Sequence, residues 1–419
     1  MNKEFNTKRV LTIALLTYAV ASSVFTTIDG GDFDVYLDAA KKMSGNMNIY
    51  IPPFVKGLQY YYSPFFAWLL IPFCNHVFIS ELFWSLLSYL LLYRTFNLII
   101  RYFDTSAITY KEYKIWVILT ILLSIQFILY NVSMIQITFF LFWAIFESIN
   151  QIFKGRYIWG GVVLGLAINI KLMPILILPF LFYRGYFKAL FIAIFTFVVL
   201  LFIPVISIGY GYNMFLLSEW WTIINPSNKE HLFEPGIGTH SLVALLPVYL
   251  TETIGELNYK RNILNLNYQT VEIIINTSRL FILALSLIFL KSMPFKKEVN
   301  KLKSFWEISY FVLIIPLLLP HQQKYAFILA IPMISYLLYF FIATSKHHKT
   351  NGYYLALFTF VICMLIYSPL YGSDIIGKFL FLYTQHFRFL TFSTLLIIPI
   401  SLFCSPDRLF KMNNKINCA

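Results

Sequence analysis

The sequence predicts an all-α, polytopic integral membrane protein. Hydrophobic residues make up 59% of the 419 residues, charged residues only 12%, and the mean hydropathy is +0.71. A soluble domain carries about 25% charged residues, so most of this surface is expected to face lipid. No long polar linker divides the chain, and residues 1–419 are therefore expected to form a single transmembrane unit.

Apolar runs recur along the whole chain, and each is expected to be a helix because a helix satisfies its backbone hydrogen bonds within its own segment. A span needs about 20 residues, and several runs are shorter than that. Strictly alternating strands of the barrel type are absent from the sequence. About twelve transmembrane helices are expected, at residues 10–28, 79–100, 115–130, 134–150, 157–170, 172–183, 189–206, 272–290, 305–319, 325–343, 353–369 and 389–404.

The first of these runs could be either a secretory signal or a membrane span. Ala19-Val20-Ala21 resembles a signal-peptide cleavage site. The apolar stretch nevertheless continues to about Ile28 and is long enough to cross a bilayer. An uncleaved first transmembrane helix is the expectation.

The formal net charge of +13 is spread between the apolar runs, as the positive-inside rule requires, and does not indicate a nucleic-acid partner. The basic clusters fall on one side if residues 62–73 do not cross and a segment near 240–250 is re-entrant. Both termini are then cytoplasmic, and the protein is expected to be a multi-pass protein of the cell (inner or plasma) membrane. The extracytoplasmic face would carry three polar stretches, at residues 29–61, 207–271 and 371–388.

Soluble-enzyme motifs are missing from the sequence. The four cysteines are scattered, without a CxxC pair, so neither a metal site nor a disulfide framework is indicated. Dinucleotide-binding, P-loop and nucleophile-elbow patterns are also absent, and no soluble domain is present to hold a nucleotide sugar. No cofactor is expected, although a divalent metal shared by Asp32 and Asp34 stays open.

An acidic cluster directly follows the first apolar run, in the sequence GDFDVY. Asp32 and Asp34 lie at its centre, in a chain with only 19 acidic residues. One interpretation is a helix N-cap, which needs a single Asp. Another is a general base at the membrane surface, where a carboxylate takes a proton from an attacking hydroxyl. A transporter's ion site is the third, but such acids normally lie inside spans.

The residues after this cluster predict a short helix and then an aromatic surface. A helix is expected over 34–43, ended by Gly45 and Asn46. Three consecutive tyrosines then precede Ser63-Pro64, which suits the first turn of another helix. Aromatic rings at the outer membrane surface suit sugars or lipid head groups, and they are equally ordinary interfacial anchors.

At these residues the chain resembles a known family. DFDVYLDAAKKMSGNMNIY and YYYSPFFAWLLIPF look like the opening of the GT-C fold glycosyltransferases that use polyprenol-phosphate sugars, and most like the bacterial α-mannosyltransferases of glycosyltransferase family 87. The stretch that contains Asn131, Gln136, three glycines and Lys171 is similar to the family's middle section. GTHSLVALL at 238–246 and PLLLPHQQKYAFILAIP at 316–332 look like its later loops. The resemblance covers about three quarters of the chain.

The resemblance implies roles for particular residues. Asp32, four residues before a tyrosine, takes the catalytic-base position, and Asp34 is second choice. Three basic residues are expected to bind the donor phosphate, because phosphate oxygens accept charge-assisted bonds from Lys and protonated His; they are Lys171, His321 and Lys324. The alternative for Lys171 is snorkelling to the outer interface. Three further residues are expected to contact the acceptor or the sugar, namely Tyr36, Tyr62 and His240.

The expected function is therefore an inverting transfer of a sugar, mannose in the first place, from a polyprenyl phosphate to an acceptor hydroxyl at the extracytoplasmic face. The expected partners are the polyprenyl-phosphate-linked donor, a glycan or glycolipid acceptor and membrane lipid. The alternative is a transporter or flippase for a lipid-linked glycan. Such a protein would need polar groups in corresponding halves of the spans, and no such internal symmetry is visible.

Overall fold

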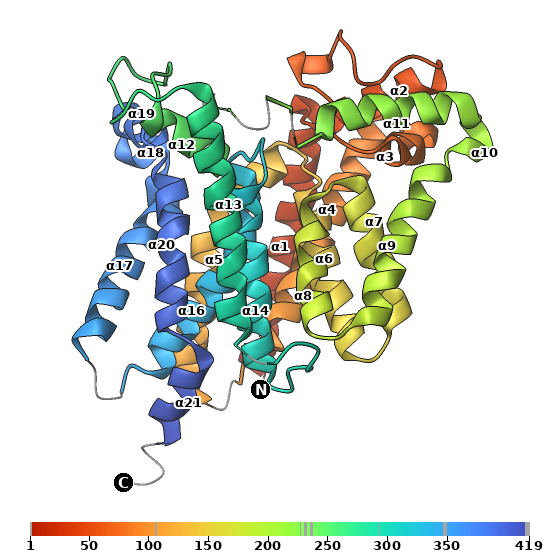
Figure 1. The fold of residues 1–419 in the computed structure, drawn as a ribbon. Coiled ribbons are helices and arrows are strands. Elements are labelled where there is room, and N and C mark those ends of the chain that lie inside the picture. The colour runs from red at the N-terminus through yellow and green to blue at the C-terminus, as the bar shows by residue number, and fades with distance from the viewer. Residues whose placement is uncertain are drawn as a thin grey trace. The chain divides into compact units, whose positions relative to one another are not determined.

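The computed structural model describes residues 2–104, 107–226, 228–229, 233–234, 238–291, 293–346 and 350–414. The described residues are mostly helical and contain no β-strand, apart from an isolated bridge between Thr239 and Gln323. This agrees with the predicted all-α fold class. The chain divides into two compact units (Figure 1).

Unit 1 comprises Met1–Leu98, Leu129–Leu172 and Lys188–Asn225. Two helices continue from one unit into the other, α4 (Val77–Ile100) and α5 (Tyr110–Ser133). All of α9 (Phe187–Phe202) except its first residue also lies in unit 1. The other elements of unit 1 are α1 (Asn2–Asp29), α2 (Phe33–Ser44), η1 (Val55–Gly57), α3 (Pro64–Leu70), η2 (Ile71–Phe73), α6 (Thr138–Phe153), α7 (Tyr157–Ile170), α10 (Val205–Ile208) and α11 (Tyr210–Ile224).

Two kinds of helix make up unit 1. The helices α4, α6, α7 and α9 run alongside one another, whereas α2, α3 and α11 lie across one end of this group (Figure 1). The predicted helix over 34–43 is confirmed as α2, and Gly45 caps its last turn through backbone bonds to Lys41 and Lys42. Ser63 caps α3 by accepting the amide of Phe66, with Pro64 in the first helical position, as the sequence predicts.

Unit 2 comprises Ile99–Ile128, Met173–Phe187 and Pro226–Ala419. Several of its helices run roughly parallel, and the short α12, α18 and α19 gather near one end of them (Figure 1). Its elements are η4 (Met173–Ile177), α8 (Leu178–Tyr183), α12 (Leu242–Leu250), α13 (Tyr268–Leu290), α14 (Lys301–Leu313), α15 (Ile315–Leu318), η6 (Lys324–Ala330), α16 (Ile331–Ala343), α17 (Asn351–Tyr367), η7 (Pro369–Tyr371), α18 (Ser373–Ile376), α19 (Lys378–His386), α20 (Phe389–Phe403) and α21 (Pro406–Asn414).

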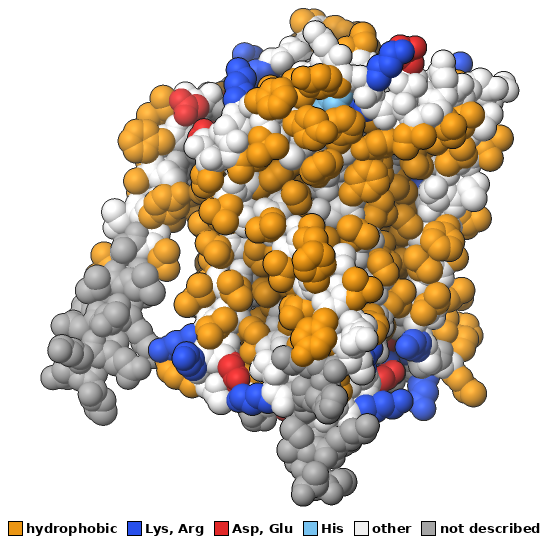
Figure 2. Space-filling view, turned by 90° about the vertical axis from the view of Figure 1, so that its left-hand side faces the viewer, with side chains coloured by type: hydrophobic (Ala, Val, Ile, Leu, Met, Phe, Trp, Pro, Cys, Tyr) orange, Lys and Arg blue, Asp and Glu red, His pale blue; other side chains and the backbone are white. Residues whose placement is uncertain are grey.

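Five helices of the described residues are long and apolar enough to cross a membrane, or up to six if the bent pair α19–α20 counts as one span. The five are Val77–Ile100, Tyr110–Ser133, Phe187–Ile208, Tyr268–Leu290 and Lys324–Ala343. Other predicted spans form shorter apolar helices, so the expected twelve spans are not confirmed. Hydrophobic side chains cover much of the face shown in Figure 2, with charged side chains toward its ends. These helices are consistent with a multi-pass membrane protein.

Some predicted boundaries move because proline or a turn interrupts the apolar run. The run 134–150 becomes α6 only from Thr138, and its first residues form the turn between α5 and α6. The run 305–319 breaks near Pro316, between α14 and α15. The segments expected not to cross are short helices. The nine residues of α12 extend about 13 Å, well under the thickness of the hydrocarbon core.

Candidate active site

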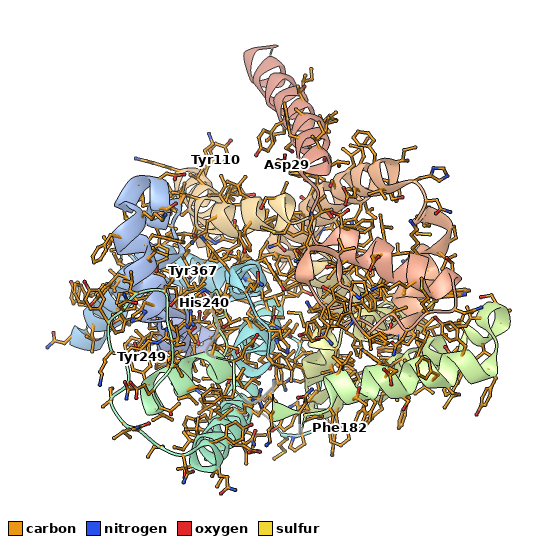
Figure 3. The ribbon with its side chains drawn as sticks, turned by 90° about the horizontal axis from the view of Figure 1, so that it is seen from above. Asp29, Tyr110, Phe182, His240, Tyr249 and Tyr367 are labelled. Carbon is orange, nitrogen blue, oxygen red and sulfur yellow. The ribbon has the colours of Figure 1, made fainter. Side chains whose placement is uncertain are left out.

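The loop between α1 and α2 is held against the turn between α5 and α6, and this contact places Asp32. Asp29 ends α1 (Figure 3), and the backbone amide of Asp32 donates to the carbonyl of Met134 at 2.8 Å. A Cβ atom on Gly31 would lie 2.5 Å from the same carbonyl oxygen, so only glycine allows this approach. Ile135, in the turn itself, has a φ of +48°.

The carboxylate of Asp32 is half-buried and bound on one side. The Nε2 of Gln136 donates a short hydrogen bond to its Oδ2. Asp32 occupies the N-cap position of α2, but its side chain makes no capping bond, so the capping interpretation is wrong for this residue. Within the described part of the chain, Oδ1 of Asp32 has no hydrogen-bond partner. Burial raises the pKa of Asp32, and Lys171, Gln136 and Lys56 partly oppose that rise.

Two buried tyrosines lie between Asp32 and Lys171. The hydroxyls of Tyr36 and Tyr62 are 2.7 Å apart, and that of Tyr36 donates to Oε1 of Gln136 at 3.4 Å. Asp32 and Tyr36 are four residues apart at the start of α2, and residues with this spacing lie on the same face of a helix. Tyr36 therefore lies on the same side of α2 as Asp32. The Nζ of Lys171 donates to the hydroxyl of Tyr62 at 3.4 Å and lies 5.0 Å from the centre of its ring.

A buried polar contact holds Tyr62 and Lys171 near each other. Ser63 Oγ, at the start of α3, donates to Oδ1 of Asn169 in the last turn of α7 at 2.9 Å. Asn169 in turn donates to the carbonyl of Phe197 in α9 at 3.0 Å. Tyr62 precedes Ser63, and Lys171 follows α7 directly, so the two contacting residues are fixed by this one link. Burial lowers the pKa of Lys171 to about 8, which the Asp32 carboxylate partly opposes.

Asp34 has different partners from Asp32. Its carboxylate forms an ion pair with Lys56 Nζ at 2.8 Å, and both side chains are partly exposed. Glu81, in the first turns of α4, is almost fully buried next to Asp34, and sequence reasoning missed it. The available signal was an acidic residue near the start of the apolar run 79–100. In the described segments, no group of three or more His, Cys, Asp or Glu side chains is placed to hold a metal ion.

Three of the expected site residues belong to unit 2, where the loops 238–241 and 321–324 pair. His240 donates its amide to the carbonyl of Gln322 at 2.8 Å, next to the bridge between Thr239 and Gln323. The carboxylate of Glu234 contacts His321 at two points. Its Oε2 accepts a hydrogen bond from the backbone amide of His321, and its Oε1 contacts the ring Nδ1, both at 2.7 Å. Glu234 was not predicted; the loop 207–271 that contains it was.

His240 and Lys324 differ in their surroundings within unit 2. His240 (Figure 3) is fully buried, and its carbonyl accepts a bond from Thr391 at 2.8 Å. Burial, with the charges of Arg388 and Lys324 beside it, lowers the pKa of His240 to about 3, so its imidazole is neutral at neutral pH. Lys324 is half-buried, with Nζ 5.7 Å from the centre of the Phe381 ring.

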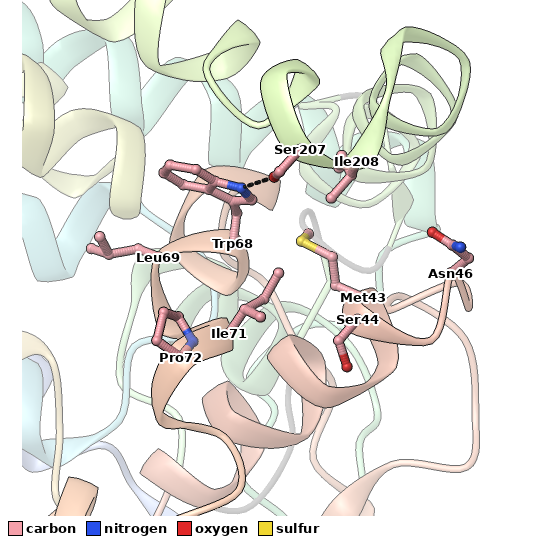
Figure 4. Close-up of a pocket in the computed structure, with 9 residues that line it drawn as sticks. All are labelled: Met43, Ser44, Asn46, Trp68, Leu69, Ile71, Pro72, Ser207 and Ile208. Atoms are coloured by element: carbon pink, nitrogen blue, oxygen red, sulfur yellow. Dashed lines mark hydrogen bonds between the residues drawn. The ribbon is translucent and has the colours of Figure 1, made fainter.

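A pocket of about 660 Å³ lies in unit 1 at the other end of α2 from Asp32 (Figure 4). Its walls come from the end of α2, from α3 with η2, and from the end of α10. Trp68 forms one wall and donates its indole N–H to Ser207 Oγ at 2.5 Å. Most of the remaining lining is apolar, including Met43 and Ile71. No sequence motif pointed to this pocket.

Unit 1 thus gathers a half-buried carboxylate, a lysine and two buried tyrosines, a set of side chains that can activate a hydroxyl for group transfer. Residues 60–258, a little under half of the chain, match the model of Glycosyltransferase family 87. Over this stretch the chain is similar to a glycosyltransferase, and the match indicates this class of enzyme. Comparison with curated proteins and with solved structures found no match.

The match covers a smaller part of the chain than the three quarters suggested by the resemblance. It includes Tyr62, Gln136, Lys171 and His240. It begins after Asp32, Asp34 and Tyr36, and it ends before His321 and Lys324. The assignment of Asp32 therefore depends on its geometry in unit 1 and on the resemblance of the sequence around it.

Proposed function

We propose that this glycosyltransferase moves a sugar, in the first place mannose, from a polyprenyl phosphate to an acceptor hydroxyl with inversion at the anomeric carbon. The observation that carries this proposal is the Asp32 carboxylate. One of its oxygens is held by Gln136, and the other has no hydrogen-bond partner in the described part of the chain. A carboxylate held in this way is suited to accept a proton from a hydroxyl.

The proposed reaction is a single displacement. The acceptor oxygen attacks the anomeric carbon while its proton passes to Oδ1 of Asp32. A new carbon–oxygen bond forms as the bond to the phosphate oxygen breaks, and the polyprenyl phosphate leaves with the electron pair. Because the attack comes from the face opposite the phosphate, the configuration inverts. No metal is needed to balance this step.

The leaving phosphate needs positive charge close by, and Lys171 is the proposed cation in unit 1. Its ammonium is held by Tyr62, and its pKa of about 8 leaves it mostly protonated at neutral pH. Tyr36 and Tyr62 are proposed as neighbours of the sugar or acceptor in unit 1. The roles of the unit 2 residues stay predictions from the sequence: His321 and Lys324 as phosphate ligands, and His240, whose neutral imidazole suits a hydroxyl better than a phosphate, as a neighbour of the sugar or acceptor.

The site is proposed to face the extracytoplasmic side of the cell membrane. Basic residues gather between the apolar runs on the other side, and the polar stretch 29–61 contains the acidic cluster. A lipid-phosphate donor reaches such a site through the bilayer. The absence of a nucleotide-binding motif from the sequence is consistent with this kind of donor.

The proposed function is tested with the purified protein in liposomes, without an ion gradient. A labelled polyprenyl-phosphate mannose is supplied with a panel of glycan and glycolipid acceptors. We expect a labelled product whose new linkage has the anomeric configuration opposite to that of the donor. Movement of the intact lipid-linked sugar across the bilayer without product would contradict the proposal and favour a flippase.

A further inference from the structure

Five side chains of unit 1 form a row in which each contacts the next: Lys171, Tyr62, Tyr36, Gln136 and Asp32. The hydroxyls of the two tyrosines could in principle exchange the roles of donor and acceptor. The groups at the two ends cannot, because an ammonium only donates hydrogen bonds and an ionised carboxylate only accepts them. The ends therefore decide the direction of every bond in between.

The direction follows step by step from Asp32. Its ionised carboxylate requires the NH₂ group of Gln136 to face it, which turns the amide oxygen of Gln136 toward Tyr36. Tyr36 has a single hydroxyl hydrogen and uses it on that oxygen. In its contact with Tyr62, Tyr36 must then be the acceptor, so Tyr62 donates. The oxygen of Tyr62 accepts from Lys171, which is consistent with the same direction.

A row with this direction excludes a proton from Oδ2 of Asp32, because a proton there would face the NH₂ group of Gln136, donor against donor. An amide suits the fourth position because it donates at one end and accepts at the other. Glutamate or leucine there would break the row.

We propose that Gln136 is the positioning residue for Asp32: as the last donor of a hydrogen-bond row that begins at Lys171, it holds Oδ2, favours the ionised carboxylate and leaves Oδ1 for the acceptor hydroxyl. This inference rests on the proposed function, in which Asp32 is the base. Gln136 is itself firmly placed. Its backbone amide donates to the carbonyl of Asn131 at 3.0 Å. In the same turn, the carbonyl of Met134 accepts a hydrogen bond from the backbone amide of Asp32.

Other charges around Asp32 do not replace this donor. The titratable groups that act on Asp32 or respond to it are Lys171, Lys56, Tyr62 and Tyr130. Lys56 is paired with Asp34 at 2.8 Å, and the tyrosines carry no positive charge. Lys171 and Lys56 act on Asp32 through their charge alone, so loss of Gln136 removes the hydrogen-bond donor among the three groups that stabilise the carboxylate.

The test is the pH profile of transferase activity for Gln136→Ala in the full-length protein. The wild-type profile is expected to be bell-shaped: activity rises as Asp32 ionises and falls when Lys171 loses its proton, near pH 8. Gln136 lowers the pKa of Asp32, so its removal should move the acid limb to higher pH. Below the wild-type optimum, kcat/KM should fall about ten- to hundredfold, which corresponds to the free energy that a hydrogen bond to a charged group contributes. The alkaline limb should stay in place.

Two further variants separate positioning from general damage. Tyr62→Phe interrupts the row between Lys171 and Tyr36, and should shift the acid limb in the same direction by less. Gln126→Ala is the matched control. Gln126 is another buried glutamine, but it lies in the part of α5 that belongs to unit 2, and its side-chain amide donates to the carbonyl of Ile366 at 3.0 Å. Its loss should lower Tm without moving either limb.

The outcomes distinguish this inference from the proposed function. An equal loss at every pH, or an unchanged profile for Gln136→Ala, would overturn the positioning role while leaving Asp32 as base. Wild-type protein without transferase activity would instead overturn the proposed function. If Gln136→Ala does not fold, Tyr62→Phe still decides, because an unmoved acid limb in that variant contradicts the row.

Discussion

Asp32 and Asp34 are two positions apart and meet different partners, because two steps along a helix turn a side chain by about 200°. Asp32 faces the α5–α6 turn and accepts a hydrogen bond from Gln136. Asp34 instead forms an ion pair with Lys56, in the segment after α2. The amino-acid pattern presents two similar carboxylates. Their surroundings give Asp32 a neutral amide donor on one oxygen, whereas Asp34 is paired with a cation.

Asp32→Asn should remove the base and preserve the fold. The amide oxygen of asparagine can still accept the bond from Gln136, and asparagine tolerates the start of a helix as well as aspartate does. We expect Tm near that of the wild type and a fall in turnover of about 10²- to 10⁴-fold. Retention of more than about a third of the activity would show that Asp32 is not the base.

Asp34→Asn is the matched change two positions along the chain. It loses an ion pair between partly exposed side chains, which contributes at most about 1 kcal/mol to stability. Its effect on turnover should be the milder of the two. If Asp34→Asn were the inactive variant, the role of base would pass to Asp34.

Among the elements, α7 depends most visibly on glycine. Gly160 packs against α6, where a Cβ would lie 2.8 Å from the carbonyl oxygen of Ser148. Gly161 and Gly165 face α9, where their Cβ atoms would meet the backbone oxygens of Ala189 and Ala193. Backbone atoms cannot rotate away as side chains do, so α7 comes this close to its neighbours only with glycine. Because Lys171 follows α7, this packing also places the proposed phosphate cation.

Gly165→Val should therefore destabilise unit 1. Overpacking of a well-packed interface costs about 1–3 kcal/mol, and here the clash is with backbone. We expect a lower Tm and a smaller yield of folded protein in a detergent thermal-shift assay. Gly211→Ala in α11 is the control, because no atom lies within 4 Å of its added Cβ and alanine favours helix. Equal Tm values for the two variants would refute the packing argument.

For the whole molecule, the distribution of Lys and Arg predicts orientation. The residues 291–303 contain the strongest basic cluster and are expected in the cytoplasm, whereas 29–61 and 371–388 are expected outside. Each of these stretches has well-exposed positions for a probe, namely Met47, Ile375 and Val299.

Single cysteines at these positions test the orientation in intact spheroplasts. A membrane-impermeant thiol reagent added outside should label Met47→Cys and Ile375→Cys but not Val299→Cys. Of the four native cysteines, those at 74, 363 and 404 are buried and Cys418 lies outside the described residues, so the protein without an added cysteine gives the background. Labelling of Val299→Cys together with protection of Met47→Cys would invert the molecule and place Asp32 in the cytoplasm.

The properties that depend on local chemistry were predictable from the amino-acid pattern. Apolar runs with little charge predicted helices in a membrane, because lipid leaves each segment to satisfy its own backbone. Gly45 and Ser63-Pro64 marked helix ends for the same local reason, since capping involves only neighbouring residues. The acidic cluster at GDFDVY also stood out on composition alone.

Tertiary structure decided which side chains meet. Gln136 lies 104 positions from Asp32, and Lys171 lies 109 from Tyr62, so neither contact follows from spacing along the chain. They arise because Gly31 lets one loop approach Met134 and because Asn169 ties α7 to the start of α3. The burial that raises the pKa of Asp32 and lowers that of Lys171 is likewise a product of packing. Periodicity reports the face on which a residue lies, whereas the partner on that face depends on how helices pack.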